Sequence, residues 1–199
     1  MEPFLTLAAP GQHREEVKDS VFLAYAGRAD SQDEAFAFLR EVLGRHTDAS
    51  HLCWAYRIGD GYRYSDGGEP TGTAGQPILR TIEGQGLDHV VVGVIRYFGG
   101  TKLGAGGLMR AYGGAAAEAL RGAPKRKETP RIVVLLDIGF DQVGSAYRIL
   151  DRLQASRLGE DYHASGVKLR AALPAGELER LETELRDATR GQFSLQVAG

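Results

Sequence analysis

The chain has 199 residues, of which 43% are hydrophobic and 25% are charged, and its formal net charge is −2. This composition is ordinary for a globular protein of one large or two small domains. It excludes a nucleic-acid binder that works through bulk positive charge, so any nucleic-acid site must be a local patch.

The N-terminus and the longest apolar run do not indicate a membrane protein. The opening residues, MEPFLTLAAPG, lack the basic start and the long apolar core of a signal peptide. The run Val90–Ile95 is too short to cross a bilayer. The single cysteine, Cys53, rules out an intrachain disulfide and favours a reducing compartment. We expect a soluble, cytoplasmic protein with no membrane partner.

Hydrophobic periodicity predicts strands and helices in alternation through the first half of the chain. Ser31 and Glu34 form a capping box at the start of a helix that Gly44 ends. The expected elements are, in order, a buried strand Ser20–Tyr25, this helix, a strand His51–Ile58 with a hairpin partner from Gly61, a helix near Pro77, a central strand His89–Phe98 and an alanine-rich helix reaching Leu120. The start of the helix near Pro77 stays open, because Thr73 with Gln76 could cap it instead.

A charged run flanked by prolines, Arg121–Arg131, interrupts this pattern and has no apolar periodicity. Such composition is typical of a connection between domains. We therefore expect an N-terminal α/β domain at residues 1–122, a linker at 123–131 and a second domain at 132–199.

The second domain has a pattern of its own. A strand, a helix, two strands, a second helix and a last strand follow one another after the linker. The helices are expected to bury Val143, Tyr147 and Leu150 in one case and Leu178, Leu181 and Leu185 in the other. The order β-α-β-β-α-β is that of a ferredoxin-like unit, so the fold class expected for the whole chain is α+β.

The run RYFGGTKLGAGGLMRAYGG, Arg96–Gly114, concentrates glycines and cations after a strand and before a helix. Backbone N–H groups and a helix N-terminus can hold an anion in that setting. The run fits neither a P-loop nor a dinucleotide fingerprint, because Leu103 follows Lys102 and Met109 stands where the fingerprint needs glycine. We predict a site for nucleic-acid phosphate made of Arg96, Gly99, Gly100, Lys102, Gly104, Gly106, Gly107 and Arg110. Alternatively, these glycines only permit a tight turn; Gly113 and Gly114 are expected to allow close helix–sheet packing.

A second polar segment, Ser65–Gly75, holds two carboxylates and three hydroxyls among glycines. Asp66 and Glu69 could act as an acid/base or Mg²⁺ pair. The Gly/Pro context favours the alternative that these side chains satisfy local backbone donors in turns. If the segment takes part in binding, Asp66, Glu69, Thr71 and Thr73 should line the opposite rim of a groove between the domains.

The histidines and the cysteine do not form a recognisable metal or nucleophile motif. His51 and Cys53 alternate on an expected strand and share a face, which could be half of a metal site. No further ligands follow at zinc-site spacing, so a buried core pair is the better interpretation. We expect no metal, no cofactor and no nucleophilic catalysis.

The run EPTGTAGQP (Glu69–Pro77), the run RYFGG (Arg96–Gly100) and the run KLGAGGLMRAY (Lys102–Tyr112) together resemble the signature of the YigZ/IMPACT family. The upstream stretches DSVFLAYA and SHLCWAYRIG are also similar to that family, with conservative departures at Ser50, Thr71 and Thr101. The resemblance implies an N-terminal domain of the type found in ribosomal proteins and in domain IV of elongation factor G. It implies a ferredoxin-like C-terminal domain akin to domain V of the same factor.

The resemblance also implies a role in translation, since both folds recur in RNA-binding machines and eukaryotic members restrain a translational stress pathway through protein contacts. The leading hypothesis is a non-enzymatic regulator of translation that binds RNA or the ribosome through the glycine-rich loop. Two alternatives stay open: a regulatory module that binds a protein partner, and an enzyme acting on a phosphorylated small molecule with Asp66 or Glu69 as base or Mg²⁺ ligand.

Overall fold

The structure is a computed structural model that describes residues 2–198, and it confirms the expected α+β class. The chain forms two compact units, residues 4–128 and residues 129–198 together with residues 2–3. The first unit contains β1 (Phe4–Leu7), β2 (Gly11–Val17), β3 (Ser20–Arg28), α1 (Gln32–Gly44), β4 (His51–Ile58), β5 (Gly61–Ser65), α2 (Gly75–Gly84), β6 (Val90–Tyr97), α3 (Ala105–Gly122) and β7 (Lys125–Glu128). The second contains β8 (Arg131–Gly139), α4 (Val143–Arg152), β9 (Ser156–His163), β10 (Gly166–Pro174), α5 (Leu178–Thr189) and β11 (Phe193–Val197).

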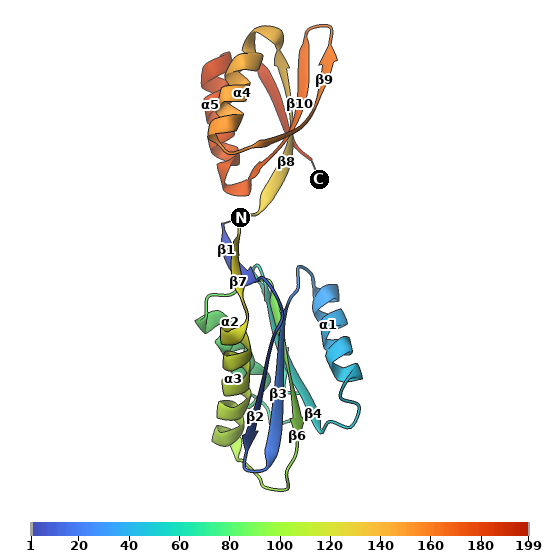
Figure 1. Cartoon of the computed structure of the whole chain (residues 1–199). Helices are drawn as coiled ribbons and strands as arrows, with labels where there is room; N and C mark the ends of the chain where they lie inside the picture. Colours follow the sequence, from blue (N-terminus) through green and yellow to red (C-terminus); the bar gives the residue numbers. More distant parts are fainter. Residues whose placement is uncertain (1, 199) are drawn as a thin grey trace. The chain divides into compact units, whose positions relative to one another are not determined.

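A five-stranded antiparallel sheet, ordered β2-β3-β6-β4-β5, forms the centre of the first unit (Figure 1). α2 and α3 pack on one face, where Phe22 and Tyr112 are fully buried. α1 packs on the other face through Ala35 and Leu39. Because both faces of β6 are covered, its sequence VVVGVIRY is a continuous apolar run rather than an alternating one.

Capping explains where two of the helices begin. The Ser31 hydroxyl accepts the Glu34 N–H at 3.2 Å, as the capping box predicts, while the Glu34 carboxylate accepts the N–H of Asp30. α2 begins at Gly75, and its N-cap residue, Ala74, has no side chain that can cap. Asp66 of the preceding loop accepts the N–H groups of Ala74 and Gly75. The expected start near Pro77 is therefore correct to within two residues, whereas the alternative cap by Thr73 is not formed.

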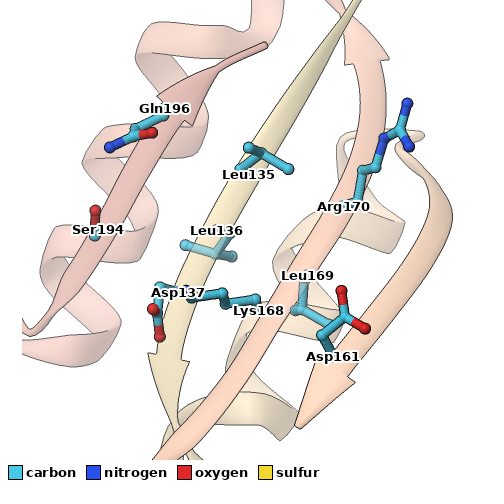
Figure 2. A pocket seen from close by; sticks show the side chains of 9 residues that line it. All are labelled: Leu135, Leu136, Asp137, Asp161, Lys168, Leu169, Arg170, Ser194 and Gln196. Carbon is cyan, nitrogen blue, oxygen red and sulfur yellow. The ribbon is translucent and has the colours of Figure 1, made fainter. Parts of the chain in front are cut away.

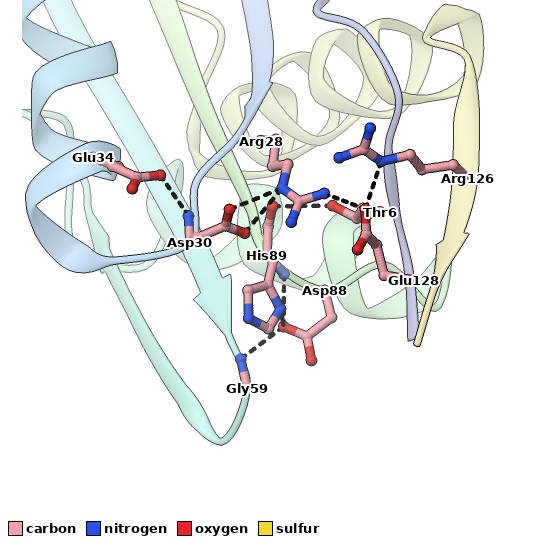
Figure 3. A network of polar contacts seen from close by, with 9 residues as sticks. All are labelled: Thr6, Arg28, Asp30, Glu34, Gly59, Asp88, His89, Arg126 and Glu128. Atoms are coloured by element: carbon pink, nitrogen blue, oxygen red, sulfur yellow. Dashed lines mark hydrogen bonds and ion pairs between the residues drawn. The ribbon is translucent and has the colours of Figure 1, made fainter. Parts of the chain in front are cut away.

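The prediction of a linker at residues 123–131 is partly wrong, because residues 125–128 form β7 and belong to the first unit. β7 pairs antiparallel with β1, which the sequence pattern did not predict. Arg28 fastens this ribbon to the end of β3, since its guanidinium bonds both Asp30 and Glu128 (Figure 3). The Arg28 guanidinium holds the pKa of the Glu128 carboxyl below its usual range. The charged composition of the run therefore supports a strand through ion pairs and not through apolar burial.

Close helix–sheet packing occurs in the first unit, but the glycine that requires it lies outside the run where we expected it. A Cβ at Gly11 of β2 would lie 2.2 Å from the Ala119 carbonyl oxygen of α3. A Cβ at Gly113 or Gly114 would make only ordinary contacts, at 3.6 and 3.5 Å. The small side chains of α3 therefore fit against an edge strand that the periodicity of the sequence did not reveal.

The second unit has a four-stranded antiparallel sheet ordered β11-β8-β10-β9. α4 and α5 cover one face, and the core between them and the sheet includes Leu136, Leu150 and Leu169. Leu150, Leu181 and Leu185 are buried as expected, whereas Val143, Tyr147 and Leu178 are only partly buried. Among residues 2–198, no helix is long and apolar enough to cross a membrane.

Candidate functional site

The predicted site residues all belong to the first unit, where the end of β6 lies beside the starts of β3 and β4. Arg96, near the end of β6, is buried instead of exposed for ligand contact. Its Nη1 donates to Glu69 Oε1 at 2.6 Å, and its Nη2 donates to the Ser20 hydroxyl at 3.2 Å. Arg96 and Glu69 were expected on opposite rims of a groove. The structure instead joins them as one ion pair, with both side chains 5% exposed.

Glu69 is the centre of this buried cluster. Its Oε1 also accepts the Tyr112 hydroxyl at 2.7 Å, which links the segment Ser65–Gly75 to the middle of α3. The pKa of the Tyr112 phenol is raised mainly by burial and to a smaller extent by the neighbouring Cys53 and Glu69. The hydroxyl therefore remains protonated and donates. A buried carboxylate that accepts two donors from different elements fixes those elements relative to one another.

Two phenylalanines lie against the Arg96 guanidinium. Its carbon is 5.5 Å from the Phe22 ring centre and 5.2 Å from that of Phe98, within the range of cation–π contact. Phe22 is buried in the core, whereas Phe98 is 49% exposed and covers the cation from the outside. The Nε of Arg96 is buried and has no hydrogen-bond partner among the described residues.

Asp66 organises the loop before α2. Its carboxylate accepts the N–H groups of Gly72, Ala74 and Gly75 at 2.8 to 3.0 Å. Burial alone would raise the pKa of Asp66, but these three backbone bonds outweigh it and hold the pKa below its usual value. The carboxylate therefore satisfies local backbone donors, as the alternative interpretation of this segment proposed, and all of its bonded donors are protein N–H groups.

The two threonines of this segment have different surroundings. Thr73 is buried, and its hydroxyl donates to the Pro70 carbonyl at 2.6 Å. Thr71 is exposed. Only Thr71 is therefore placed to meet a ligand in solution.

Cys53 is buried beside this cluster, and its thiol donates to the Asp66 carbonyl at 2.9 Å. Burial raises the pKa of the thiol to about 12, so it is not a thiolate at neutral pH. His51 is half-buried, and its Nδ1 lies 2.9 Å from the Gly67 carbonyl. The expected buried pair is correct for Cys53 and only partly for His51. Within the described residues no group of three or more histidine, cysteine or carboxylate side chains could hold a metal ion.

The glycine-rich loop lies against the turn between β2 and β3. A Cβ at Gly99 would lie 2.1 Å from the carbonyl of Asp19, so only glycine fits there without a shift of the backbone. Ser20 joins the loop to the buried cluster, because its hydroxyl accepts the Gly99 N–H as well as Arg96. The same turn contains Lys18, a cation that the sequence pattern did not single out.

The loop ends at the first turn of α3, which no side chain of the described residues caps. The N-cap residue is Gly104, with φ of 73°, and the first turn contains no acidic residue. Gly106 is exposed and Gly107 half-buried, so the backbone at this end is open to solvent. Lys102 and Arg110 flank it, both exposed, and neither forms an ion pair or a side-chain hydrogen bond within residues 2–198. We call residues 98–110 the cationic loop.

Ser20 and Tyr112 are the functional-site residues that periodicity alone missed. Ser20 begins a strand and Tyr112 lies in a helix, so the local pattern of each is that of any residue in a strand or a helix. Their only sequence signal is their place in the signature stretches DSVFLAYA and KLGAGGLMRAY. Their role depends on Arg96 and Glu69, which lie at least 16 residues away from either of them along the chain.

These features define a two-unit α+β protein in which a buried Glu–Arg cluster supports a glycine-rich, cationic loop. The Impact N-terminal domain model matches residues 18–120, and a domain of unknown function, DUF1949, matches residues 136–192. The chain belongs to the IMPACT family. It is 48% identical over 178 residues to "IMPACT family member in pol 5'region" of Thermus thermophilus, covering 89% of this chain and 97% of that protein.

Two further relatives cover nearly the whole chain. "IMPACT family member YigZ" of Escherichia coli (strain K12) is 37% identical over 200 residues, covering 98% of both proteins. A solved structure titled "Crystal structure of an hypothetical protein" matches with a TM-score of 0.71 and 36% identity, covering 100% of this chain and 98% of that one. The similarity therefore extends over both units and not only over the signature.

Proposed function

We propose that this protein is a non-enzymatic regulator of translation that binds RNA or the ribosome, with the cationic loop as its contact to nucleic-acid phosphate. The observation that carries the proposal is the pair Lys102 and Arg110. Both are exposed and free of carboxylate partners within the described residues, on either side of the uncapped first turn of α3. Cations paired with neighbouring carboxylates would have little charge left for a ligand.

The physical basis is the free N-terminus of an 18-residue helix. The first N–H groups of a helix have no partner inside the helix, and the helix dipole places partial positive charge there. Asp66 satisfies such donors at the start of α2, whereas no side chain in the part of the chain that the structure describes does so at the start of α3. A phosphate group between Lys102, Arg110 and this turn would meet both charge and oriented donors.

The buried cluster supports the loop in this proposal and does not contact the ligand. Arg96 is already bonded to Glu69 and Ser20, and Ser20 in turn accepts the Gly99 N–H. The loop is thereby attached to the core at its first glycine. The Cys53 thiol, with its pKa raised to about 12, is a poor nucleophile, which favours a binding function over covalent catalysis.

The architecture of both units is compatible with an RNA-binding role. We infer a ferredoxin-like fold for the second unit, because its element order is β-α-β-β-α-β and its two helices share one face of the sheet. We infer the elongation factor G domain IV type for the first unit from the signature residues. Because one fold can serve many functions, the test addresses the loop itself.

One observation favours a second candidate, a module that binds a regulatory protein. Phe98 and Met109 are 49% and 39% exposed within the cationic loop. Exposed aromatic and methionine side chains next to arginine are typical of the centres of protein interfaces. Under this candidate, substitution of Phe98 would weaken partner binding more than substitution of Lys102.

The test is fluorescence anisotropy with short labelled single- and double-stranded RNAs across a salt series. We expect micromolar binding that weakens steeply with salt, and a flatter slope for the Lys102→Ala/Arg110→Ala variant. Each phosphate of a single strand that the variant no longer neutralises should reduce the log–log slope by about 0.7. The control is Arg40→Ala/Arg80→Ala, which removes the same charge from exposed positions of α1 and α2.

Equal reductions in the two double variants would show that overall charge, and not the loop, governs binding. The absence of RNA binding at low salt would remove the proposal. The protein-binding candidate would then be tested by comparing Phe98→Ala with wild type in partner capture.

A further inference from the structure

β11 is an edge strand of the second unit that has no charged side chain. Its sequence is FSLQV, and within residues 2–198 it pairs only with β8. Exposed edge strands usually carry charged residues, proline or a β-bulge, because their free N–H and C=O groups would otherwise pair with another chain. β11 has none of these features.

The other sheet edges of residues 2–198 are charged or covered. β7 is the charged run KRKE, and β1 has no charge but is covered, since its Leu5 carbonyl accepts the Asp88 N–H and Leu5 bridges to Leu87. β2 carries Arg14, Glu15 and Glu16, and β5 carries Arg63. β9 carries several charges, and its pairing with β10 is interrupted by a register shift between Arg170 and Ala171. Among the edges of the described residues, β11 is therefore the one that has neither a charged side chain nor a covering segment on its free side.

The hydrogen-bond register shows which groups of β11 are free. The Ala198 N–H donates to the Val133 carbonyl, and Val197 pairs with Val134. Bonded and non-bonded pairs alternate along an antiparallel ladder, so Ser194 and Gln196 also direct their backbone groups to β8. The N–H and C=O groups of Phe193, Leu195 and Val197 consequently point away from the sheet.

The side chains of β11 also define what could pair there. Phe193, Leu195 and Val197 pair in register with residues of β8 that face the helices, and Val197 is 51% exposed. Ser194 and Gln196 lie on the opposite, outer face, where they help to line a shallow groove of about 390 Å³ with Asp137, Lys168 and Arg170 (Figure 2). A strand added at this edge must present apolar residues on the helix face and uncharged polar residues on the outer face.

β11 itself meets this requirement, and we propose that two copies of this chain associate by antiparallel pairing of β11 with β11. In a two-fold arrangement centred on Leu195, each Leu195 lies opposite its counterpart, and Phe193 lies opposite Val197. These are the residues whose backbone groups are free, so each pair can exchange two N–H···O bonds. Ser194 faces Gln196 on the outer side, and no like charges meet.

The short length of the strand determines the strength of the association. Five residues bury less surface than the roughly 1,600 Å² of a standard stable interface, so the dimer is a weak, concentration-dependent species. The pairing would join two four-stranded sheets into one of eight strands. The partner is thus a second copy of the chain, recognised by backbone pairing and by an apolar and polar alternation that matches its own.

The test is sedimentation velocity of the full chain from about 1 μM to about 1 mM, a range that covers weak association. We expect the sedimentation coefficient to rise with concentration for the wild type. Val197→Pro removes an outward N–H without breaking the bonds to β8, and Val197→Lys adds a protective charge. Each should weaken association at least tenfold. Leu158→Lys is the control, because Leu158 on the β9 edge is also 51% exposed, and it should leave association unchanged.

Amide hydrogen exchange followed by NMR distinguishes this edge from any other interface. At high concentration the N–H groups of Phe193, Leu195 and Val197 should become protected, while those of Ser194 and Gln196, already bonded to β8, should change little. A chain that remains monomeric throughout the range would overturn the proposal. So would a dimer that both Val197 variants retain at wild-type strength.

Discussion

Glu69 Oε1 and Arg96 Nη1 lie 2.6 Å apart, and the two side chains are each 5% exposed. They come from a loop and from the central strand, 27 residues apart in the chain. Removal of one partner of a buried pair leaves an uncompensated charge in the interior, which is costlier than the loss of an exposed pair. The pair should therefore contribute to the stability of the first unit.

Arg96→Met should lower the free energy of unfolding by about 3–5 kcal/mol, because the Glu69 carboxylate would lose its charged partner while staying buried. The measurement is urea denaturation, read from the midpoint at an unchanged slope. Glu69→Met/Arg96→Met should lose less than Arg96→Met alone, since no buried charge remains unpaired. Arg14→Met, at an exposed pair with Glu16, should cost about 0–1 kcal/mol. Similar losses for Arg96→Met and Arg14→Met would contradict the importance of burial.

Asp66→Asn should lower stability at neutral pH by about 1 kcal/mol, because an amide caps the start of α2 less well than a carboxylate. The pKa of Asp66 is depressed in the folded protein from its ordinary value of 3.8. The contribution of the ionised Asp66 carboxylate to stability is therefore complete above the ordinary pKa. It is lost as the pH falls through the lower pKa of the folded protein. Chemical denaturation from pH 7 to pH 2 should show the wild type and the variant converging below about pH 4. A difference that stays constant across this range would show that the carboxylate charge is not the cause.

Cys53 should react slowly with a thiol reagent in the folded protein. Its pKa is raised from 9.0 to about 12, which reduces the thiolate fraction near neutral pH by about a thousandfold, and burial slows access further. The measurement is the rate of labelling with a chromogenic disulfide at pH 8, compared with the same chain in urea. Fast labelling of the native protein would point to an activated thiol and would contradict the expectation of no nucleophilic catalysis.

Gly99→Ala should disturb the cationic loop, because the added Cβ would lie 2.1 Å from the Asp19 carbonyl. We expect a loss of stability of about 1–3 kcal/mol and weaker RNA binding, since the loop can no longer lie against the β2–β3 turn. Stability is measured by thermal unfolding, and binding by anisotropy. Gly44→Ala is the matched control, because a Cβ at Gly44 meets nothing within 4 Å and its φ is not positive. The prediction fails if the two variants behave alike.

Much of the secondary structure follows from local patterns in the sequence. The strand from His51 to Ile58 and the order of elements in the second unit agree with their periodicity, because buried faces repeat every two residues in strands and about every 3.6 in helices. β1, β2 and β7 lack such a signal. The sequence KRKE of β7 contains no apolar residue. This strand depends on its pairing with β1 and on the ion pairs that Glu128 forms with Arg28 and Arg126.

The sequence by itself determined the family, the α+β class and the position of the glycine-rich loop, because these are written in contiguous residues. Only the tertiary structure decided the roles of the charged residues within the signature. Arg96, Lys102 and Arg110 look alike as cations in the sequence, yet Arg96 is buried against Glu69 while the other two remain exposed. The reason is physical: whether a charge is available to a ligand depends on burial and on a partner distant in the chain, and neither is encoded in local spacing.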